Sequence, residues 1–116
     1  MPRINPLLEK SFAFSLKIIA VAQLLQRKRE YVLSKQLLKS GTSIGANIEE
    51  AQQAQSKNDF ISKMSIALKE GYETRYWLRL LCDSKILTLE ETKGLLSDVD
   101  ELIRMLVAVI KTSRQL

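Results

Sequence analysis

The chain has 116 residues, the length of one domain around one hydrophobic core. Two prolines, four glycines, one cysteine and no histidine favour helices, exclude an intramolecular disulfide and remove the commonest metal ligand and general base. The formal net charge of +5 is concentrated in residues 1–40, where eight Lys and Arg stand against two Glu. That distribution is compatible with binding a polyanion, or with a solvated basic surface.

Residues 7–27 are predicted to form the first helix, because their apolar side chains recur three and four residues apart. They make two adjacent stripes: Leu8, Phe12, Ile19 and Ala22 in one, and Leu7, Phe14, Ile18, Val21 and Leu25 in the other. A helix on the outside of a monomeric bundle needs an apolar stripe only about 100° wide. The extra apolar surface of this helix therefore has two explanations. Either the helix lies deeper in the chain's own core, or it forms a subunit interface through Phe14, Ile18, Val21 and Leu25.

A second long helix is expected from about Glu30 to Ala54, after a basic turn at residues 27–29. Gly41 and Gly45 lie inside it, one turn apart, although a glycine within a helix costs about 1 kcal/mol relative to alanine. We interpret them, with Ser34, as a groove of small residues that admits a neighbouring helix closely. The side facing the core is predicted to hold Leu33, Leu37, Ile44, Ile48 and Ala51.

The third helix is predicted to start at a capping box formed by Ser56 and Asp59 and to run to Cys82. Its core face holds Phe60, Met64, Ala67, Gly71, Leu78 and Cys82. A mixed apolar and acidic stripe points away from that core and comprises Ile66, Glu70, Glu73, Trp77 and Leu80. We interpret this stripe as an interface with a partner chain; the alternative is scattered surface apolarity.

A second capping box, from Thr88 to Glu91, marks the start of a fourth helix, whose inward residues recur at helical spacing as far as Ile110. The four helices are joined by connections of a few residues, which force neighbouring helices to run antiparallel. The predicted fold is therefore all-α: an antiparallel up-down-up-down four-helix bundle, with residues 1–116 forming a single domain.

Known chemistry of such bundles is mostly excluded by the residues present. A di-iron site calls for Glu-x-x-His pairs, and there is no histidine. An all-carboxylate magnesium site could use Glu70 and Glu73 with Asp98 and Glu101, as in a nucleotide hydrolase. Helical projection places Glu101 nearly opposite Asp98, however, so the pairs are not expected to converge.

Thiol catalysis and nucleotide phosphate binding are not expected either. Cys82 is interpreted as a packing residue, and no phosphate-binding loop is present. We therefore predict no catalytic residue, metal, cofactor or small-molecule substrate. No apolar run approaches the roughly 20 residues of a membrane span, and no signal peptide is visible. A reducing cytoplasm is the expected compartment, without a membrane partner.

Charged residues suggest two further features. Arg75 projects toward the core side of its helix, where an unpaired charge is costly, so a carboxylate partner is expected, with Glu50 or Glu49 as the candidate. A phosphate-tracking surface is predicted from the basic residues of the first half, although a solvated face is the plain alternative. Its members would be Lys10, Lys17, Arg27, Lys28, Arg29, Lys35 and Lys39.

Two segments in combination resemble the 23S rRNA intervening-sequence protein family. They are Gln36–Ala51, QLLKSGTSIGANIEEA, and, after Asp59 and Phe60, residues 66–78, IALKEGYETRYWL. The family's motif positions fall here on Ser43, Ile44, Asn47, Glu50, Glu70, Glu73 and Trp77. Gly41 departs from the alanine that many relatives carry. The resemblance implies a small four-helix bundle related to the accessory protein of diversity-generating retroelements, a basic pentameric barrel.

These observations support a non-enzymatic homo-oligomer, a pentamer by resemblance, whose basic first half contacts RNA or a nucleic-acid complex. A second hypothesis is a protein-interaction scaffold without direct contact to nucleic acid. A third, a magnesium-dependent nucleotide hydrolase, stays open at this point.

Overall fold

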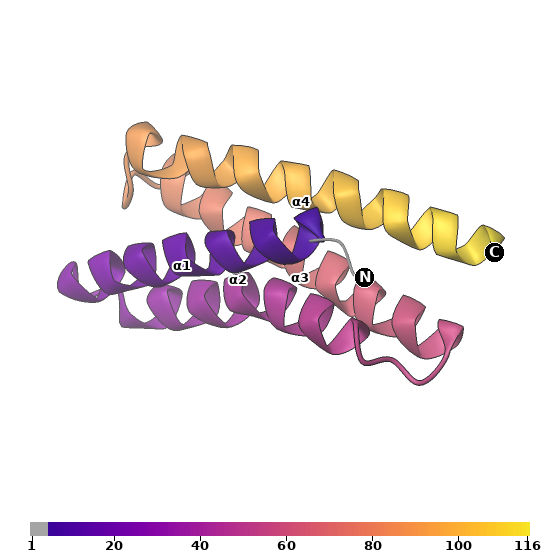
Figure 1. Cartoon of the computed structure of the whole chain (residues 1–116). Helices are drawn as coiled ribbons and strands as arrows, with labels where there is room; N and C mark the ends of the chain where they lie inside the picture. The colour runs from indigo at the N-terminus through magenta and orange to yellow at the C-terminus, as the bar shows by residue number, and fades with distance from the viewer. Residues whose placement is uncertain (1–4) are drawn as a thin grey trace.

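The structure is a computed structural model that describes residues 5–116. Four helices make up its regular structure: α1 (Pro6–Arg27), α2 (Tyr31–Ala51), α3 (Lys57–Asp83) and α4 (Leu89–Gln115). They contact one another in the ring order α1, α2, α3, α4, and the seam that closes the ring between α4 and α1 is the least extensive (Figure 1). Across residues 5–116, none of these helices combines the length and the apolarity that crossing a bilayer requires. The all-α fold is as predicted.

Neighbouring helices run in opposite directions. Across the α1–α4 seam, Lys10 pairs with Glu101 and Lys17 with Asp98, so residue numbers rise along one helix as they fall along the other. The same reversal holds for the other three interfaces in the pairs Ser11–Gly45 and Ala22–Ser34, Ser40–Thr74 and Glu50–Lys63, and Gly71–Ile103 and Arg75–Asp100. The connections accordingly lie at alternate ends of the bundle (Figure 1).

Side-chain caps fix where three of the helices begin. The Asn5 Oδ1 accepts a hydrogen bond from the Leu7 N–H at 2.9 Å, at the start of α1. Thr88 and Glu91 form a complete capping box at α4, with hydrogen bonds of 3.1 and 2.8 Å. At α3 the Ser56 Oγ accepts from the Asp59 N–H at 3.0 Å. The box there is incomplete, because the Asp59 carboxylate accepts instead from the N–H of Gln55.

Of the two alternatives for α1, the structure shows deeper burial in the chain's own core, and the assignment of Phe14, Ile18 and Leu25 to a subunit interface was wrong. The residues that α1 buries in the core are Leu7, Ser11, Phe14, Ile18, Ala22 and Leu25. Phe14, Ile18 and Leu25, predicted as subunit contacts, are at most 1% exposed and are therefore unavailable to another chain. The exposed stripe is instead Phe12, Leu16 and Ile19, at 66%, 56% and 39% exposure. Val21 is half-buried between the two.

Two glycines of α2 explain why α1 turns the stripe that contains Phe14, Ile18 and Leu25 toward the core. A Cβ at Gly41 would lie 2.8 Å from the Cγ atoms of Ile18, closer than side chains pack, and one at Gly45 would lie 3.3 Å from the Ser11 carbonyl oxygen. Ile18 therefore occupies the space that a side chain would take at Gly41. The predicted close approach of a neighbouring helix is present, and that neighbour is α1.

Candidate nucleic-acid interface

The α1–α2 turn presents three consecutive cations, Arg27, Lys28 and Arg29. Arg29 adopts a left-handed backbone conformation with φ of 63°. Its N–H donates to the Gln26 carbonyl and the Glu30 N–H to the Leu25 carbonyl, both at 2.9 Å. This is the Schellman ending of a helix, in which the left-handed position is usually glycine. Arginine stands there although the left-handed region disfavours residues with a Cβ by roughly 1–2 kcal/mol.

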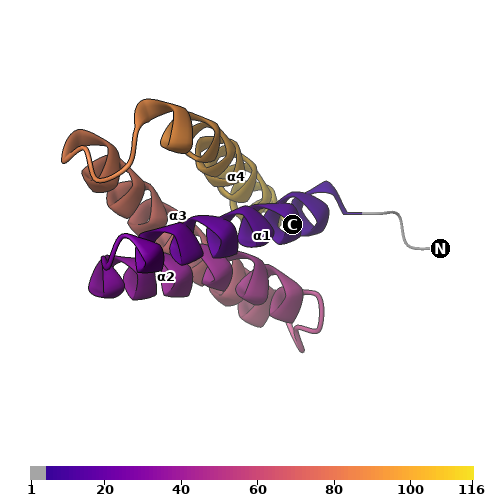
Figure 2. The ribbon, with the colours of Figure 1, turned by 90° about the vertical axis from the view of Figure 1, so that its left-hand side faces the viewer.

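Every side chain of this turn faces solvent. Arg27, Lys28 and Arg29 are all exposed, and none makes an ion pair within residues 5–116. Tyr31, the first residue of α2, is 61% exposed beside them. Lys85 in the α3–α4 connection also has a left-handed backbone, with φ of 67°. Figure 2 views the bundle from the end that carries both connections. Arg29 and Lys85 therefore place two cations at the same end of the molecule, each at a backbone position where glycine would be less strained.

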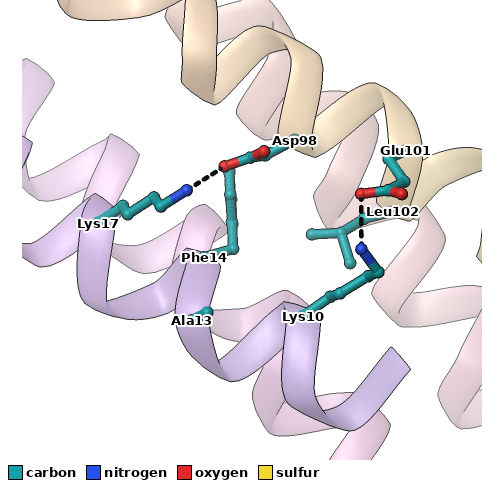
Figure 3. Close-up of a pocket in the computed structure, with 7 residues that line it drawn as sticks. All are labelled: Lys10, Ala13, Phe14, Lys17, Asp98, Glu101 and Leu102. Atoms are coloured by element: carbon teal, nitrogen blue, oxygen red, sulfur yellow. Dashed lines mark hydrogen bonds and ion pairs between the residues drawn. The ribbon is translucent and has the colours of Figure 1, made fainter. Parts of the chain in front are cut away.

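Lys10 and Lys17, predicted as part of the same surface, lie elsewhere. Both point into the α1–α4 seam, where Lys10 Nζ lies 3.2 Å from Glu101 Oε1 and Lys17 Nζ 2.8 Å from Asp98 Oδ2 (Figure 3). A cavity of about 200 Å³ lies between these ion pairs, with Phe14 among its lining residues. Because two carboxylates stand beside the two lysines, the seam repels an approaching phosphate as much as it attracts one.

The predicted basic surface is thus split. Lys35 and Lys39 are exposed on α2, one and two turns from the α1–α2 turn, and make no ion pair among the described residues. We call Arg27, Lys28, Arg29, Lys35 and Lys39 the basic end. Lys10 and Lys17 are not part of it.

The motif residues of the two matching segments divide between core and surface. Ile44 is buried in the core and Glu50 pairs with Lys63, whereas the others are half-buried: Ser43, Asn47, Glu70, Glu73 and Trp77. On α2 the side chains of Ser43 and Asn47 donate to carbonyl oxygens one turn earlier, at 2.6 and 2.8 Å. On α3 the Trp77 indole N–H donates to Glu73 Oε2 at 3.4 Å. Burial, and then repulsion by Glu73, raises the pKa of Glu70, while Lys69 and Lys39 oppose the rise. The α3 part of this surface is therefore acidic, and the carboxylate of Glu70 is partly desolvated.

The partner predicted for Arg75 was wrong. Its guanidinium lies 3.2 Å from Asp100 Oδ1 of α4 and 5.1 Å from the centre of the Tyr72 ring. Glu50 pairs with Lys63 instead, at 3.1 Å. Arg75 is also half-exposed rather than enclosed in the core. It therefore joins α3 to α4 at the surface, where such a pair contributes about 0–1 kcal/mol.

The predicted placement of the α4 carboxylates was wrong as well. Asp98 and Glu101 both face α1, rather than lying on nearly opposite sides of α4. Glu70 and Glu73 lie on the far side of the bundle, near α2. Over residues 5–116 no group of three or more His, Cys, Asp or Glu side chains is placed to hold a metal ion. Cys82 is half-buried beside the core.

An apolar face on α1 and α2 went unrecognised in the sequence, because Phe12 and Ile19 were not assigned to the surface and Leu16 and Leu38 were placed in no stripe. Phe12, Leu16 and Ile19 of α1 lie on it with Leu38 of α2, which is 36% exposed. A groove of about 290 Å³ runs between the two helices here, with Gly45 and Ala46 in its wall. We call these residues the α1–α2 apolar face. Helical periodicity alone could have found its α1 part, as the stripe that holds Phe12 and Ile19.

Comparison with known proteins identifies the family. A family model described as 23S rRNA-intervening sequence protein matches residues 5–108, which include α1, α2, α3 and most of α4. The chain belongs to the 23S rRNA-intervening sequence protein family. No curated protein matches it significantly.

A solved structure of a protein of unknown function from Bacteroides thetaiotaomicron, assigned to the S23 ribosomal protein family, is similar to this family member. The two share 46% sequence identity over 90% of this chain and 98% of that one, with a TM-score of 0.88. Similarity of this extent shows a common fold along nearly the whole chain.

Proposed function

We propose that this member of the 23S rRNA-intervening sequence protein family is a non-enzymatic, cytoplasmic homo-oligomer that binds RNA through the basic end. The observation that carries the proposal is the α1–α2 turn, where three exposed cations stand beside the exposed ring of Tyr31 and lack ion-pair partners in the described chain. Arg29 supports it further, since a positive charge is kept at a position where glycine would be more stable. The family's name links its members to ribosomal RNA genes.

The contacts available favour recognition of the phosphate backbone. Lysine and arginine neutralise phosphates and release counterions, so binding through them weakens as salt rises. Tyr31 follows the cluster in the chain and its ring is exposed, so it offers stacking for an unpaired base. Binding is therefore expected to depend on RNA shape and charge more than on base sequence.

Replacing Lys28, Arg29, Lys35 and Lys39 by Glu is expected to weaken binding to structured RNA by about a hundredfold or more and to flatten its salt dependence, because four phosphate contacts are lost. Fluorescence anisotropy over a series of salt concentrations measures both quantities. The matched control replaces Lys10, Lys17, Lys63 and Lys93, which already have carboxylate partners, by Glu. Equal affinity of the two quadruple variants would refute the proposed site.

The oligomer that we propose joins two different faces. The α1–α2 apolar face carries Lys35 near its apolar residues, whereas the α3 stripe combines Ile66 and Leu80, 40% and 41% exposed, with the carboxylates of Glu70 and Glu73. The positive charge of Lys35 complements these carboxylates, whereas Glu49 in the groove opposes them. Both faces offer apolar surface. A contact between unlike faces is heterologous, and it closes into a ring when its rotation permits. A pentamer is the ring size that the family resemblance suggests.

Phe12→Asp is expected to dissociate the oligomer to monomers at micromolar concentration, since it places a charge in the centre of the α1–α2 apolar face. Multi-angle light scattering measures the mass, and circular dichroism checks that the fold is kept. Glu9→Lys, an exposed change of charge nearer the helix start, serves as the control. A wild-type protein that is monomeric at these concentrations would contradict the proposed assembly.

A scaffold that recruits another protein is the second candidate function. It is favoured by the α3 stripe, because Trp77 packs against the edge of the core but stays half-buried, with its indole N–H donating to Glu73. The two candidates make opposite predictions for purification from cells. Copurified RNA that is lost with the basic-end variant supports the first, whereas copurified protein without RNA supports the second.

A further inference from the structure

A second basic surface lies on α4, toward the end of the molecule opposite the basic end (Figure 1). Arg104, Val107, Lys111 and Arg114 recur at spacings of three and four residues, so they share one side of the helix, and all four are exposed. We call these four residues the α4 C-terminal face. Half of the chain's cations lie in residues 59–116, where charge is balanced overall, so composition did not reveal this cluster.

The cations of this face have no acidic partners. No ion pair involves Arg104, Lys111 or Arg114 anywhere in residues 5–116. The carboxylate of Asp100, one turn before Arg104, already forms an ion pair with Arg75. Arg114 lies in the last turn, where a cation stabilises the helix dipole. That effect fades within one turn, so it does not account for Arg104, more than two turns from the end.

A hollow with an apolar floor lies among these cations. It measures about 310 Å³ and is lined by Leu68 of α3 and by Val107, Ile110, Lys111, Arg114 and Gln115 of α4. One turn along α3 from Leu68 is Tyr72, with 45% of its surface exposed and the Arg75 guanidinium 5.1 Å from its ring centre. Apolar and aromatic surface bounded by cations accommodates a planar base with a phosphate on either side.

We propose that the α4 C-terminal face binds single-stranded RNA, with one unpaired base in the hollow and the adjoining phosphates on Lys111, Arg114 and Arg104. This inference rests on the proposed function, since it takes RNA to be the partner, and it adds a second contact of a different kind. The basic end reads backbone charge, whereas the hollow accepts a base only when that base is unpaired. The proposed oligomer leaves this face free, because it uses the side of α3 nearer α2.

Three proteins test the second contact against the first: the double variant Lys111→Glu/Arg114→Glu, the basic-end quadruple variant, and a charge-matched control, Lys69→Glu/Lys93→Glu. Each is titrated with a single-stranded oligonucleotide and with a blunt duplex of equal length over a salt series. The double variant is expected to lose about tenfold in affinity for the single strand relative to the control, with the salt slope lower by about 1.4, or 0.7 for each of two phosphates. Its affinity for the duplex should match that of the control.

Photo-crosslinking with 4-thiouridine in the single strand gives an independent measurement. Crosslinks are expected in the peptide that holds Val107 and Lys111, and Val107→Asp, which places a charge in the hollow, should remove them while circular dichroism stays unchanged.

The outcomes separate the two proposals. Binding lost only in the basic-end variant overturns the second contact and leaves the proposed function standing. Equal losses for single strand and duplex overturn the base-binding hollow. If the double variant binds RNA like the control but no longer sediments with vesicles of 30% phosphatidylserine, the face binds an anionic membrane and the inference is wrong. If wild-type protein binds neither RNA, both proposals fail.

Discussion

Phe14→Ala is expected to lower the free energy of unfolding by about 3–5 kcal/mol, the range for removing a buried aromatic ring from a packed core. Phe14 is 1% exposed, whereas Phe12, two residues earlier, is 66% exposed. Phe12→Ala should therefore change the stability of the monomer by less than about 0.5 kcal/mol. Replacing phenylalanine by alanine thus affects different properties on the two sides of α1: the stability of the fold at Phe14 and the association of subunits at Phe12.

Chemical denaturation followed by circular dichroism measures both variants. Because association of folded subunits adds concentration-dependent stability, the comparison is made at several protein concentrations and extrapolated to the dilute limit. Equal losses for Phe12→Ala and Phe14→Ala at that limit would mean that α1 is rotated from the orientation described here.

Gly41→Ala is expected to destabilise the protein, and Gly94→Ala to stabilise it. In a helix alanine is favoured over glycine by about 1 kcal/mol, and a Cβ at Gly94 would meet no atom within 4 Å. At Gly41 the new methyl group would lie 2.8 Å from Ile18. Overpacking of this kind costs about 1–3 kcal/mol. The two variants should therefore differ by about 1–3 kcal/mol, although the chemical change is identical.

Urea midpoints of the two glycine variants give this difference directly. Ile18→Ala removes the Cγ atoms that the new methyl group would meet, so the double variant with Gly41→Ala should recover part of the loss beyond additivity. Simple additivity of the two changes would show that Ile18 and Gly41 are not coupled and that the close approach of α1 has another cause.

Most of the fold could be predicted from local signals. The caps at Ser56 and Thr88, the absence of prolines after Pro6 and the three-and-four spacing of apolar residues were enough to define four helices. The orientation of α1 was not predictable in this way, because both of its stripes are apolar. The decisive contacts are non-local: α1 packs so closely on α2 that a Cβ at Gly45 would lie 3.3 Å from the Ser11 carbonyl oxygen, and one at Gly41 2.8 Å from Ile18.

The candidate site was predictable only where a single element carries it. The α1–α2 turn is a continuous run of cations, so its exposure followed from the sequence. Lys17 and Arg75 were misjudged because their partners, Asp98 and Asp100, lie on a helix whose rotation the sequence left open. A charge next to a carboxylate on another element cannot be told from a free one until the packing is known.

The α1–α4 seam determines the order in which the bundle is expected to fold. Its ion pairs join residues 81 and 91 positions apart, whereas the Ser34–Ala22 hydrogen bond between α1 and α2 spans only 12. Closing the longer loop costs about 2 kcal/mol more in chain entropy, and two exposed ion pairs return about 0–1 kcal/mol each. The α1–α2 and α3–α4 hairpins should therefore form early, and the first and last helices should meet last and separate first on unfolding.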